Sequence, residues 1–243
     1  MIPARKHPTF NHWFSAYARA KLRGSFEALR AEGMDSLRDT VRESPAVVVL
    51  NHTSWWDPLL ILHLSQHVLR ADGFAMMDAA NLTRLPFFGL VGAFGVDRSS
   101  PSDGASVLRY AAKLLDRPGR VVWVFPQGSE RPSTERPLSF KPGSAELARL
   151  ARCPTVPVGV RYEWRGAERP EALLSVGAPI APERDTKSGR EAHERAVTER
   201  LDRVDRALID GTVAEWEPLL TRPPDAAGEW ATRALAWVTQ PRG

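Results

Sequence analysis

Three stretches of this sequence are apolar at most positions, and segments of helical pattern separate them. The apolar stretches are AVVVLN at 46–51, RVVWVF at 120–125 and TVPVGVRYEW at 155–164, with helices expected at 58–70, 103–116 and 143–152. Strands that are apolar on both faces are typical of parallel sheets that helices cover on both sides. The sequence therefore predicts the α/β class, with a mostly parallel or mixed central sheet flanked by helices on both faces.

The chain is long enough to bury a substantial core, with 243 residues of which 43% are hydrophobic. We expect one structural unit, made of an N-terminal amphipathic helical region at 1–40 and an α/β domain with C-terminal helices at 41–243. The polar stretch at 181–195 is expected to connect the sheet to those helices. The last thirty residues, which contain three tryptophans, are expected to be helical.

Cysteine content and charge exclude several classes of protein. Cys153 is the single cysteine, so the chain has neither an internal disulfide nor a zinc site built on thiolates. A net charge of +4 is too small to indicate a nucleic-acid partner. No segment reaches the roughly 18 consecutive apolar residues of a transmembrane helix, and the first residues lack the apolar core of a signal peptide. A cytoplasmic protein is the expectation.

Apolar side chains recur at intervals of mostly three and four residues through 9–31, as on one face of a helix. They are Phe10, Trp13, Phe14, Tyr17, Leu22, Phe26 and Leu29, and the basic residues beside them are Arg19, Lys21, Arg23 and Arg30. Such a helix either packs on its own domain or lies in a membrane interface, and the same stripe serves both. The second alternative predicts a peripheral protein on the inner face of the membrane.

The stretch AVVVLNHTSWWDP ends a buried strand in a polar turn that holds His52 and Asp57. Open α/β folds place ligands at the carboxyl ends of their strands. Asp57 precedes Pro58, which predicts a helix N-cap followed by a proline in the first turn. A carboxylate that reaches an imidazole fixes its tautomer and stabilises the imidazolium formed when the ring takes a hydroxyl proton. Alternatively, Asp57 only caps the helix and His52 only binds backbone.

Four further motifs follow in order. They are GAFGVDR at 92–98, FPQGSERP at 125–132, FKPG at 140–143 and TVPVGV at 155–160. Together with NHTSWWD, this ordered set resembles the glycerolipid acyltransferase family that includes lysophosphatidic acid acyltransferases. The family pattern is Asn-His-four residues-Asp, a Gly/Asp/Arg block, Phe-Pro-Glu-Gly-Thr-Arg, Phe-Lys-x-Gly and a Val-Pro-Val-like strand.

The resemblance implies transfer of a fatty acyl group from a thioester, on coenzyme A or acyl carrier protein, to the hydroxyl of a lipid acceptor. No cofactor is implied, because the acyl thioester is itself a substrate. The resemblance makes His52 the general base and Asp57 its support. It also makes Arg98 a substrate-binding arginine, which could instead form an ion pair with a neighbouring aspartate, and Lys141 the lysine of Phe-Lys-x-Gly.

The loop FPQGSERP supplies further candidates and departs from the family pattern. Acyl transfer needs backbone amides that stabilise a tetrahedral oxyanion, and Gly128 and Ser129 are placed to offer them. Gln127 replaces the family's Glu, and Glu130 displaces Arg131 by one position. Both Gln127 and Arg131 are substrate-binding candidates. Because a phosphate dianion needs several charge-assisted donors, a neutral acceptor such as a glycosylated lipid or carotenoid glycoside is an alternative to a lysophospholipid.

Other functions stay open at this point. A thioesterase would use the same base with water in place of the alcohol, and a non-catalytic membrane-binding module would retain only the fold. His63 and His67 lie four residues apart on an expected helix, but the sequence supplies no third ligand for a metal.

Overall fold

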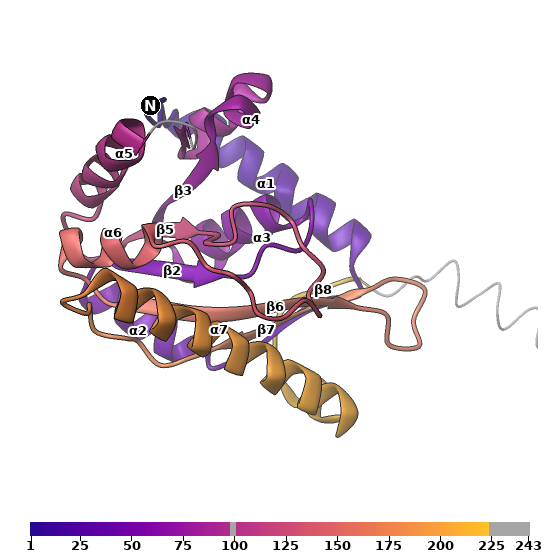
Figure 1. Cartoon of the computed structure of the whole chain (residues 1–243). Helices are drawn as coiled ribbons and strands as arrows, with labels where there is room; N and C mark the ends of the chain where they lie inside the picture. Colours follow the sequence, from indigo (N-terminus) through magenta and orange to yellow (C-terminus); the bar gives the residue numbers. More distant parts are fainter. Residues whose placement is uncertain (98–100, 224–243) are drawn as a thin grey trace, which may run out of the picture.

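The computed structural model describes residues 1–97 and 101–223 and is built around one central sheet (Figure 1). In these residues the sheet has eight strands in the order β4-β3-β5-β2-β6-β7-β1-β8. The strands are β1 Ala28–Glu32, β2 Ala46–Leu50, β3 Asp72–Asp78, β4 Ala93–Val96, β5 Arg120–Val124, β6 Thr155–Glu163, β7 Glu171–Val176 and β8 Glu217–Thr221. Only β6 with β7 and β1 with β8 pair antiparallel, so the predicted mixed, mostly parallel sheet is confirmed.

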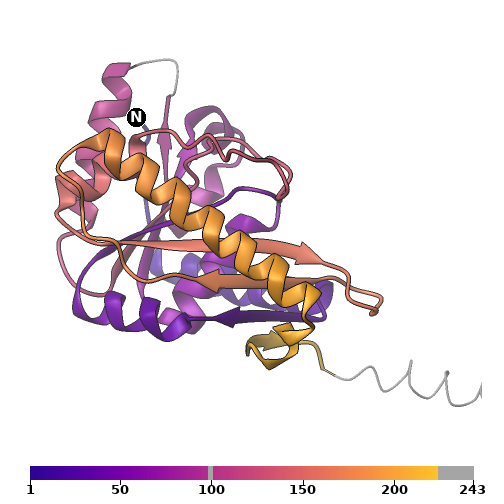
Figure 2. The same cartoon turned by 60° about the horizontal axis from the view of Figure 1, so that its bottom comes forward.

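Helices cover both faces of the sheet. They are α1 Pro8–Ser25, α2 Met34–Glu43, α3 Asp57–His63, α4 Ala79–Arg84, α5 Pro101–Leu114, α6 Gly143–Ala151 and α7 Thr186–Ile209, with the shorter π or 3-10 segments η1 Leu64–Leu69, η2 Pro86–Val91 and η3 Thr212–Glu215. The core residues of α1, α2 and α3 pack on one face, and those of α6 and α7 on the other, where α7 crosses the strands (Figure 2).

The central strand β2 explains why its sequence is apolar throughout. Val48 and Leu50 pack in the core beneath α1 and α3, whereas Val47 and Val49 pack in the core beneath α6 and α7. All four side chains are fully buried. A strand with a helical layer on each side has no face left for polar residues.

The helix expected to run through residue 31 ends earlier, so that prediction was wrong. α1 ends at Ser25, and Ala28–Glu32 form β1, which pairs in parallel with β7. Phe26 and Leu29 are buried but do not lie on the helix. The region 1–40 is therefore not helical throughout, because β1 belongs to the central sheet. The spacing of apolar residues in a short segment is compatible with either a helix or a strand. Pairing with a strand that is distant in the sequence decides between the two.

Two expectations for the C-terminal part were also wrong. The second half of 181–195 is not a connector but the start of α7, where Asp185 accepts a hydrogen bond from Ser188 N as N-cap. Within the last thirty residues, Glu217–Thr221 form the edge strand β8 rather than a helix. This strand forms because β1 leaves one edge of the sheet unpaired and β8 covers it. The helices expected at 224–243 lie outside the described residues.

A buried histidine makes the fold sensitive to acid. His193 on α7 lies in the interior, with Nδ1 3.1 Å from Ser144 Oγ. Burial lowers the pKa of His193 from 6.5 to about 4. Because the folded state disfavours the charged ring, the stabilisation by His193 is complete above pH 6.5 and is lost as the pH falls towards 4.

We expect this residue to lower the free energy of unfolding by about 3 kcal/mol over that pH range. In His193→Asn, which keeps a polar partner for Ser144 but cannot titrate, the acid-induced loss of stability should be smaller by the same amount. Urea unfolding of both proteins, near neutral pH and near the folded-state pKa, measures the difference. Equal losses in the two proteins would contradict the assignment.

Candidate active site

The site begins where β2 ends. Asn51, the residue after the strand, donates from Nδ2 to Val160 O at 2.9 Å and accepts at Oδ1 from Val160 N at 2.8 Å. The amide side chain offers the same donor and acceptor as a backbone peptide, so it extends the pairing of β2 with β6 by one position. The main chain is therefore held firmly at the point where it leaves the sheet and enters the turn before α3.

Asp57 is fully buried, and its carboxylate accepts four hydrogen bonds. Oδ2 accepts from His52 Nδ1 at 2.7 Å and from the amides of Thr53 at 2.9 Å and Ser54 at 3.1 Å. Oδ1 accepts from the hydroxyl of Tyr162 on β6 at 2.7 Å. An ionised carboxylate only accepts, so we assign the proton of His52 to Nδ1, which leaves Nε2 as the basic nitrogen.

The expectation that Asp57 is the N-cap was wrong. Trp56 holds that position, and Asp57 is the first residue of α3. The carboxylate turns back over the preceding turn, where its four donors lie. Burial and the neighbouring Asp57 raise the pKa of Tyr162 well above its usual value, so the phenol stays protonated and donates at neutral pH. No motif in the sequence indicated Tyr162, because its partner lies on a different element.

The loop after β5 holds the main chain of His52 on both sides. Gln127 Oε1 accepts from His52 N at 2.7 Å, and Arg131 N donates to His52 O at 2.9 Å. The Gln127 side chain is buried, and the Arg131 guanidinium forms an ion pair with Glu135. Both substrate-binding candidates thus contact the backbone of the proposed base.

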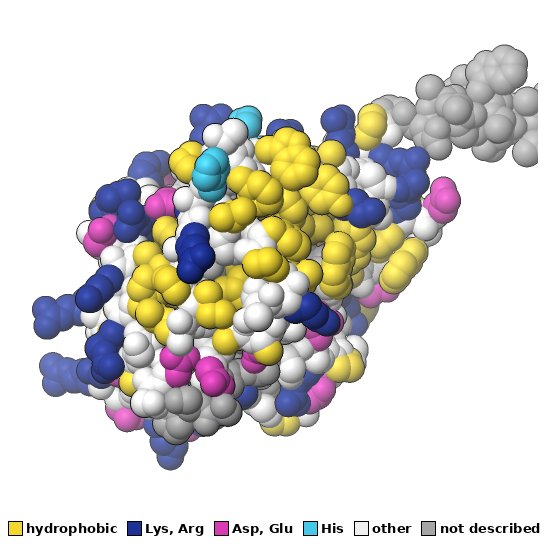
Figure 3. Space-filling model, turned by 90° about the horizontal axis from the view of Figure 1, so that it is seen from above, with side chains coloured by type: hydrophobic (Ala, Val, Ile, Leu, Met, Phe, Trp, Pro, Cys, Tyr) yellow, Lys and Arg dark blue, Asp and Glu magenta, His cyan; other side chains and the backbone are white. Residues whose placement is uncertain are grey.

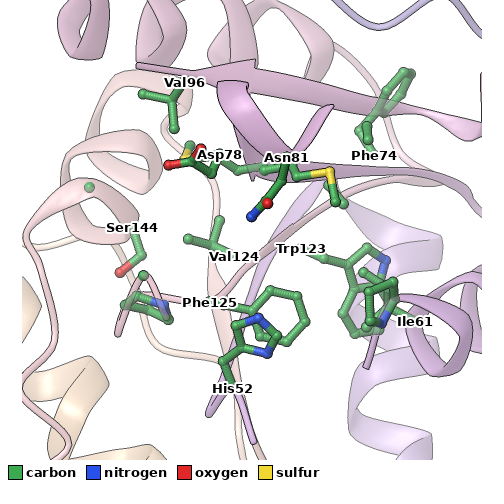
Figure 4. A pocket seen from close by; sticks show the side chains of 18 of the residues that line it. His52, Ile61, Phe74, Asp78, Asn81, Val96, Trp123, Val124, Phe125 and Ser144 are labelled. Carbon is green, nitrogen blue, oxygen red and sulfur yellow. The ribbon is translucent and has the colours of Figure 1, made fainter. Parts of the chain in front are cut away.

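His52 faces a cavity of about 500 Å³ with mostly apolar walls (Figure 4). The Phe125 ring lies beside the imidazole, with 4.5 Å between the ring centroids. Trp123 and the apolar face of α3 form one side of the cavity, and Asp78 and Asn81 lie across it from His52. A cavity of this kind suits an apolar chain whose polar end reaches the few polar groups.

The other residues predicted from the sequence to belong to the site differ in whether they line the cavity. Gly128, Ser129 and Lys141 line the cavity with His52, whereas Gln127 and Arg131 are not among the described residues that line it. Gly128 N donates to Phe125 O at 3.0 Å and closes a turn, so this amide is occupied in the structure. Ser129 N is then the better oxyanion candidate of the two. Arg98 lies outside the described residues.

The histidine pair and the single cysteine lie away from the cavity in the part of the chain that the structure describes. That part contains no group of three or more side chains able to hold a metal ion. Burial, with smaller contributions from His67 and Arg19, lowers the pKa of His63 to about 4. Burial raises the pKa of Cys153 to about 11, so the thiol is protonated at neutral pH and is a poor nucleophile.

The site combines a histidine that a buried carboxylate orients, at the end of a central strand, with a cavity of mostly apolar walls. The sequence matches the family model of acyltransferases over residues 29–161, more than half of the chain. The chain belongs to the acyltransferase family.

Several known proteins are similar to this chain. A 1-acyl-sn-glycerol-3-phosphate acyltransferase of Streptococcus pneumoniae is 29% identical over 116 residues, 46% of this chain and 40% of that protein. The enzyme of the same name from Cocos nucifera is 25% identical over 194 residues, 75% of this chain and 59% of that protein. The chain thus spans about half the length of these relatives.

The fold is also similar to that of a solved structure. The crystal structure of the 1-acyl-sn-glycerophosphate acyltransferase PlsC from Thermotoga maritima matches with a TM-score of 0.53 and 20% identity. The match covers 78% of this chain and 79% of that one. At this identity the similarity supports the architecture rather than the details of a substrate.

Proposed function

We propose that this protein is an O-acyltransferase that moves a fatty acyl group from a thioester to the hydroxyl of a lysophospholipid. The observation that carries the proposal is the His52–Asp57 pair, 2.7 Å apart, on the wall of an apolar cavity. The names of the relatives support a glycerophospholipid as acceptor. Acyl-coenzyme A or acyl carrier protein is the proposed donor.

In the proposed mechanism His52 Nε2 takes the proton of the acceptor hydroxyl as the oxygen attacks the thioester carbonyl. The imidazolium that forms is stabilised by the Asp57 carboxylate, which already accepts from Nδ1. The carbonyl oxygen becomes an oxyanion, for which Ser129 N is the candidate donor. The intermediate collapses by breaking the carbon–sulfur bond, and the proton on Nε2 passes to the departing thiolate.

We also propose that the enzyme works at the cytoplasmic surface of a membrane through α1. The side chains of Trp13 and Tyr17 are 60% and 47% exposed to solvent. Large amphipathic aromatic side chains are more favourably placed at an interface between water and lipid. Phe14 packs against Phe88, which lines the cavity, so this apolar surface leads towards the site. Figure 3 shows hydrophobic side chains gathered across this side of the molecule. No helix among the described residues is long and apolar enough to cross a bilayer.

The proposal is tested by thiol release from palmitoyl-coenzyme A, with and without lysophosphatidic acid, another lysophospholipid, glycerol 3-phosphate or a glycosylated lipid. We expect a lysophospholipid to stimulate release and to appear as the diacyl product by mass spectrometry. Release without any acceptor would indicate a thioesterase. Stimulation by the glycosylated lipid alone would overturn the phospholipid assignment, and the same panel with a carrier-protein thioester distinguishes the donors.

Tyr162→Phe is expected to lower kcat about 10-fold and to leave KM for the thioester nearly unchanged. Phenylalanine keeps the ring contact with Phe26, whose centroid is 5.5 Å away, but removes the donor to Asp57 Oδ1. The buried carboxylate then lacks one partner, at a cost of about 1–3 kcal/mol. Steady-state kinetics with thermal unfolding measures both effects. An unchanged kcat together with a lower stability would make Tyr162 purely structural.

A further inference from the structure

A second hollow, of about 700 Å³, lies at the end of α1 that is remote from its N-terminus. Its charged lining consists of Arg19 and Arg23 on α1, Arg169 in the loop between β6 and β7, and Arg222 after β8. His67 of η1, Pro223 and small residues of α1 also line it, and none of the described residues in its wall is acidic. We call this feature the arginine hollow.

Three of the four arginines that line the hollow have no acidic partner among the described residues. Within 1–97 and 101–223, Arg19, Arg23 and Arg169 form no ion pair, and the buried Nε of Arg169 has no hydrogen-bond partner. The nearby Glu171 is already bound by Arg30 and Arg165. Guanidinium groups that converge without an acid repel one another, and they match the oxygens of a phosphate in charge and geometry.

The position of the arginine hollow favours a lipid as the source of that phosphate. Ala16 and Ala20 line the hollow, and Tyr17 between them is one of the exposed aromatic residues of α1. Figure 3 shows Lys and Arg side chains gathered beside the hydrophobic surface, close to where the described chain ends. Cations next to an apolar surface meet the headgroup layer when that surface enters a membrane.

We propose that the arginine hollow binds the phosphate of an anionic phospholipid while the aromatic side of α1 lies in the membrane interface. This site is separate from the catalytic one, because α3 and η1 run without a break from Asp57 to His67 and the seven residues of α3 alone span about 10 Å. The hollow therefore fixes how the enzyme sits on the membrane rather than the acceptor that reacts. The inference rests on the proposed membrane contact of α1, and its test separates the two.

The test is co-sedimentation of the whole chain with phosphatidylcholine vesicles and with vesicles that also contain phosphatidylglycerol. Binding to the neutral vesicles reports on the aromatic side of α1, and the additional binding to anionic vesicles reports on the arginines. In Arg19→Gln/Arg23→Gln we expect the neutral binding to persist and the anionic partition to fall about 30-fold, since each basic residue near an anionic surface contributes about 1 kcal/mol. Glutamine is a good helix former, so α1 should persist.

The matched control is Arg195→Gln/Arg206→Gln, which removes the same charge from exposed arginines of α7 on the other face of the sheet. We expect this variant to bind anionic vesicles as the wild type does. Equal losses of anionic-vesicle binding in the two variants would show that only net charge matters, and the arginine hollow would not be a binding site. Arg19→Lys/Arg23→Lys keeps the charge but loses the planar donors, so it should retain only part of the anionic binding.

Two further measurements identify the ligand. If inorganic phosphate raises the thermal stability of the wild type but anionic vesicles bind no better than neutral ones, the hollow binds free phosphate and the lipid assignment is wrong. If the Arg19→Gln/Arg23→Gln variant in detergent loses transfer from a carrier-protein thioester but not from coenzyme A, the hollow is a docking site for the acidic carrier protein, and the proposal is overturned. If no vesicle binds even the wild type, the membrane contact of α1 fails as well.

Discussion

Replacing His52 with alanine should lower acyl transfer about 1,000-fold, because the acceptor hydroxyl loses its general base. The imidazole is partly exposed to the cavity, and its removal takes one of four donors from Asp57 and the ring contact from Phe125. We therefore expect a modest loss of stability, about 1–3 kcal/mol. Product formation followed by mass spectrometry in detergent, with circular dichroism on the same samples, measures the two effects.

His12→Ala is a suitable control for this variant, since His12 is an exposed histidine on α1 that does not line the cavity. It should transfer the acyl group at the rate of the wild type. His52→Gln keeps a side-chain donor within reach of Asp57 but has no basic nitrogen, so it should be as inactive as the alanine variant while unfolding more like the wild type. Near wild-type transfer by either His52 variant would remove His52 as the base.

Asp57→Asn should lower kcat about 100-fold to 1,000-fold with little change in fold, which is a loss of about 3–4 kcal/mol of transition-state stabilisation. The amide oxygen can take the place of Oδ2, where it still accepts from Thr53 N, Ser54 N and His52 Nδ1. The amide nitrogen then faces the Tyr162 hydroxyl, which can accept a hydrogen bond instead of donating one. The geometry of the site therefore persists in the variant, but the imidazolium loses the stabilisation by the negative charge of the carboxylate.

The arrangement of donors around Asp57 predicts a second outcome. In Asp57→Asn the Tyr162 hydroxyl becomes the acceptor of the amide nitrogen. The additional change Tyr162→Phe should leave that buried nitrogen without an acceptor and destabilise the double variant. Thermal unfolding of the two single variants and the double variant measures this coupling. If Asp57→Asn alone transfers the acyl group at the wild-type rate, the carboxylate has no role beyond holding the turn.

The candidate site was predictable from the sequence only in part. His52 and Asp57 lie only five positions apart in the chain, so a single turn can bring their side chains within hydrogen-bond distance. The role of Gln127 was not predictable in this way. Its position in the motif suggested a contact with the acceptor, but its side chain is buried against the main chain of His52.

The fold, too, was predictable from the sequence only in part. The central strands were predicted because burial on both faces demands an apolar residue at each position, which is visible in any one of them. The segment Ala28–Glu32 and the edge strand Glu217–Thr221 were missed, because each is a strand only through the neighbour that it pairs with. Short segments of mixed pattern adopt the state that their tertiary partners allow.

The sequence by itself determined the α/β class, the order of the motifs and the His52–Asp57 pair, since each depends on residues that are neighbours in the chain. Only the tertiary structure decided that Tyr162 donates to Asp57 across 105 positions, that Gln127 holds His52 across 75, and that four separate segments form the arginine hollow. The contacts of Tyr162 and Gln127 follow from how β2, β5 and β6 lie side by side in the sheet. That order is a property of the whole chain, and no local pattern encodes it.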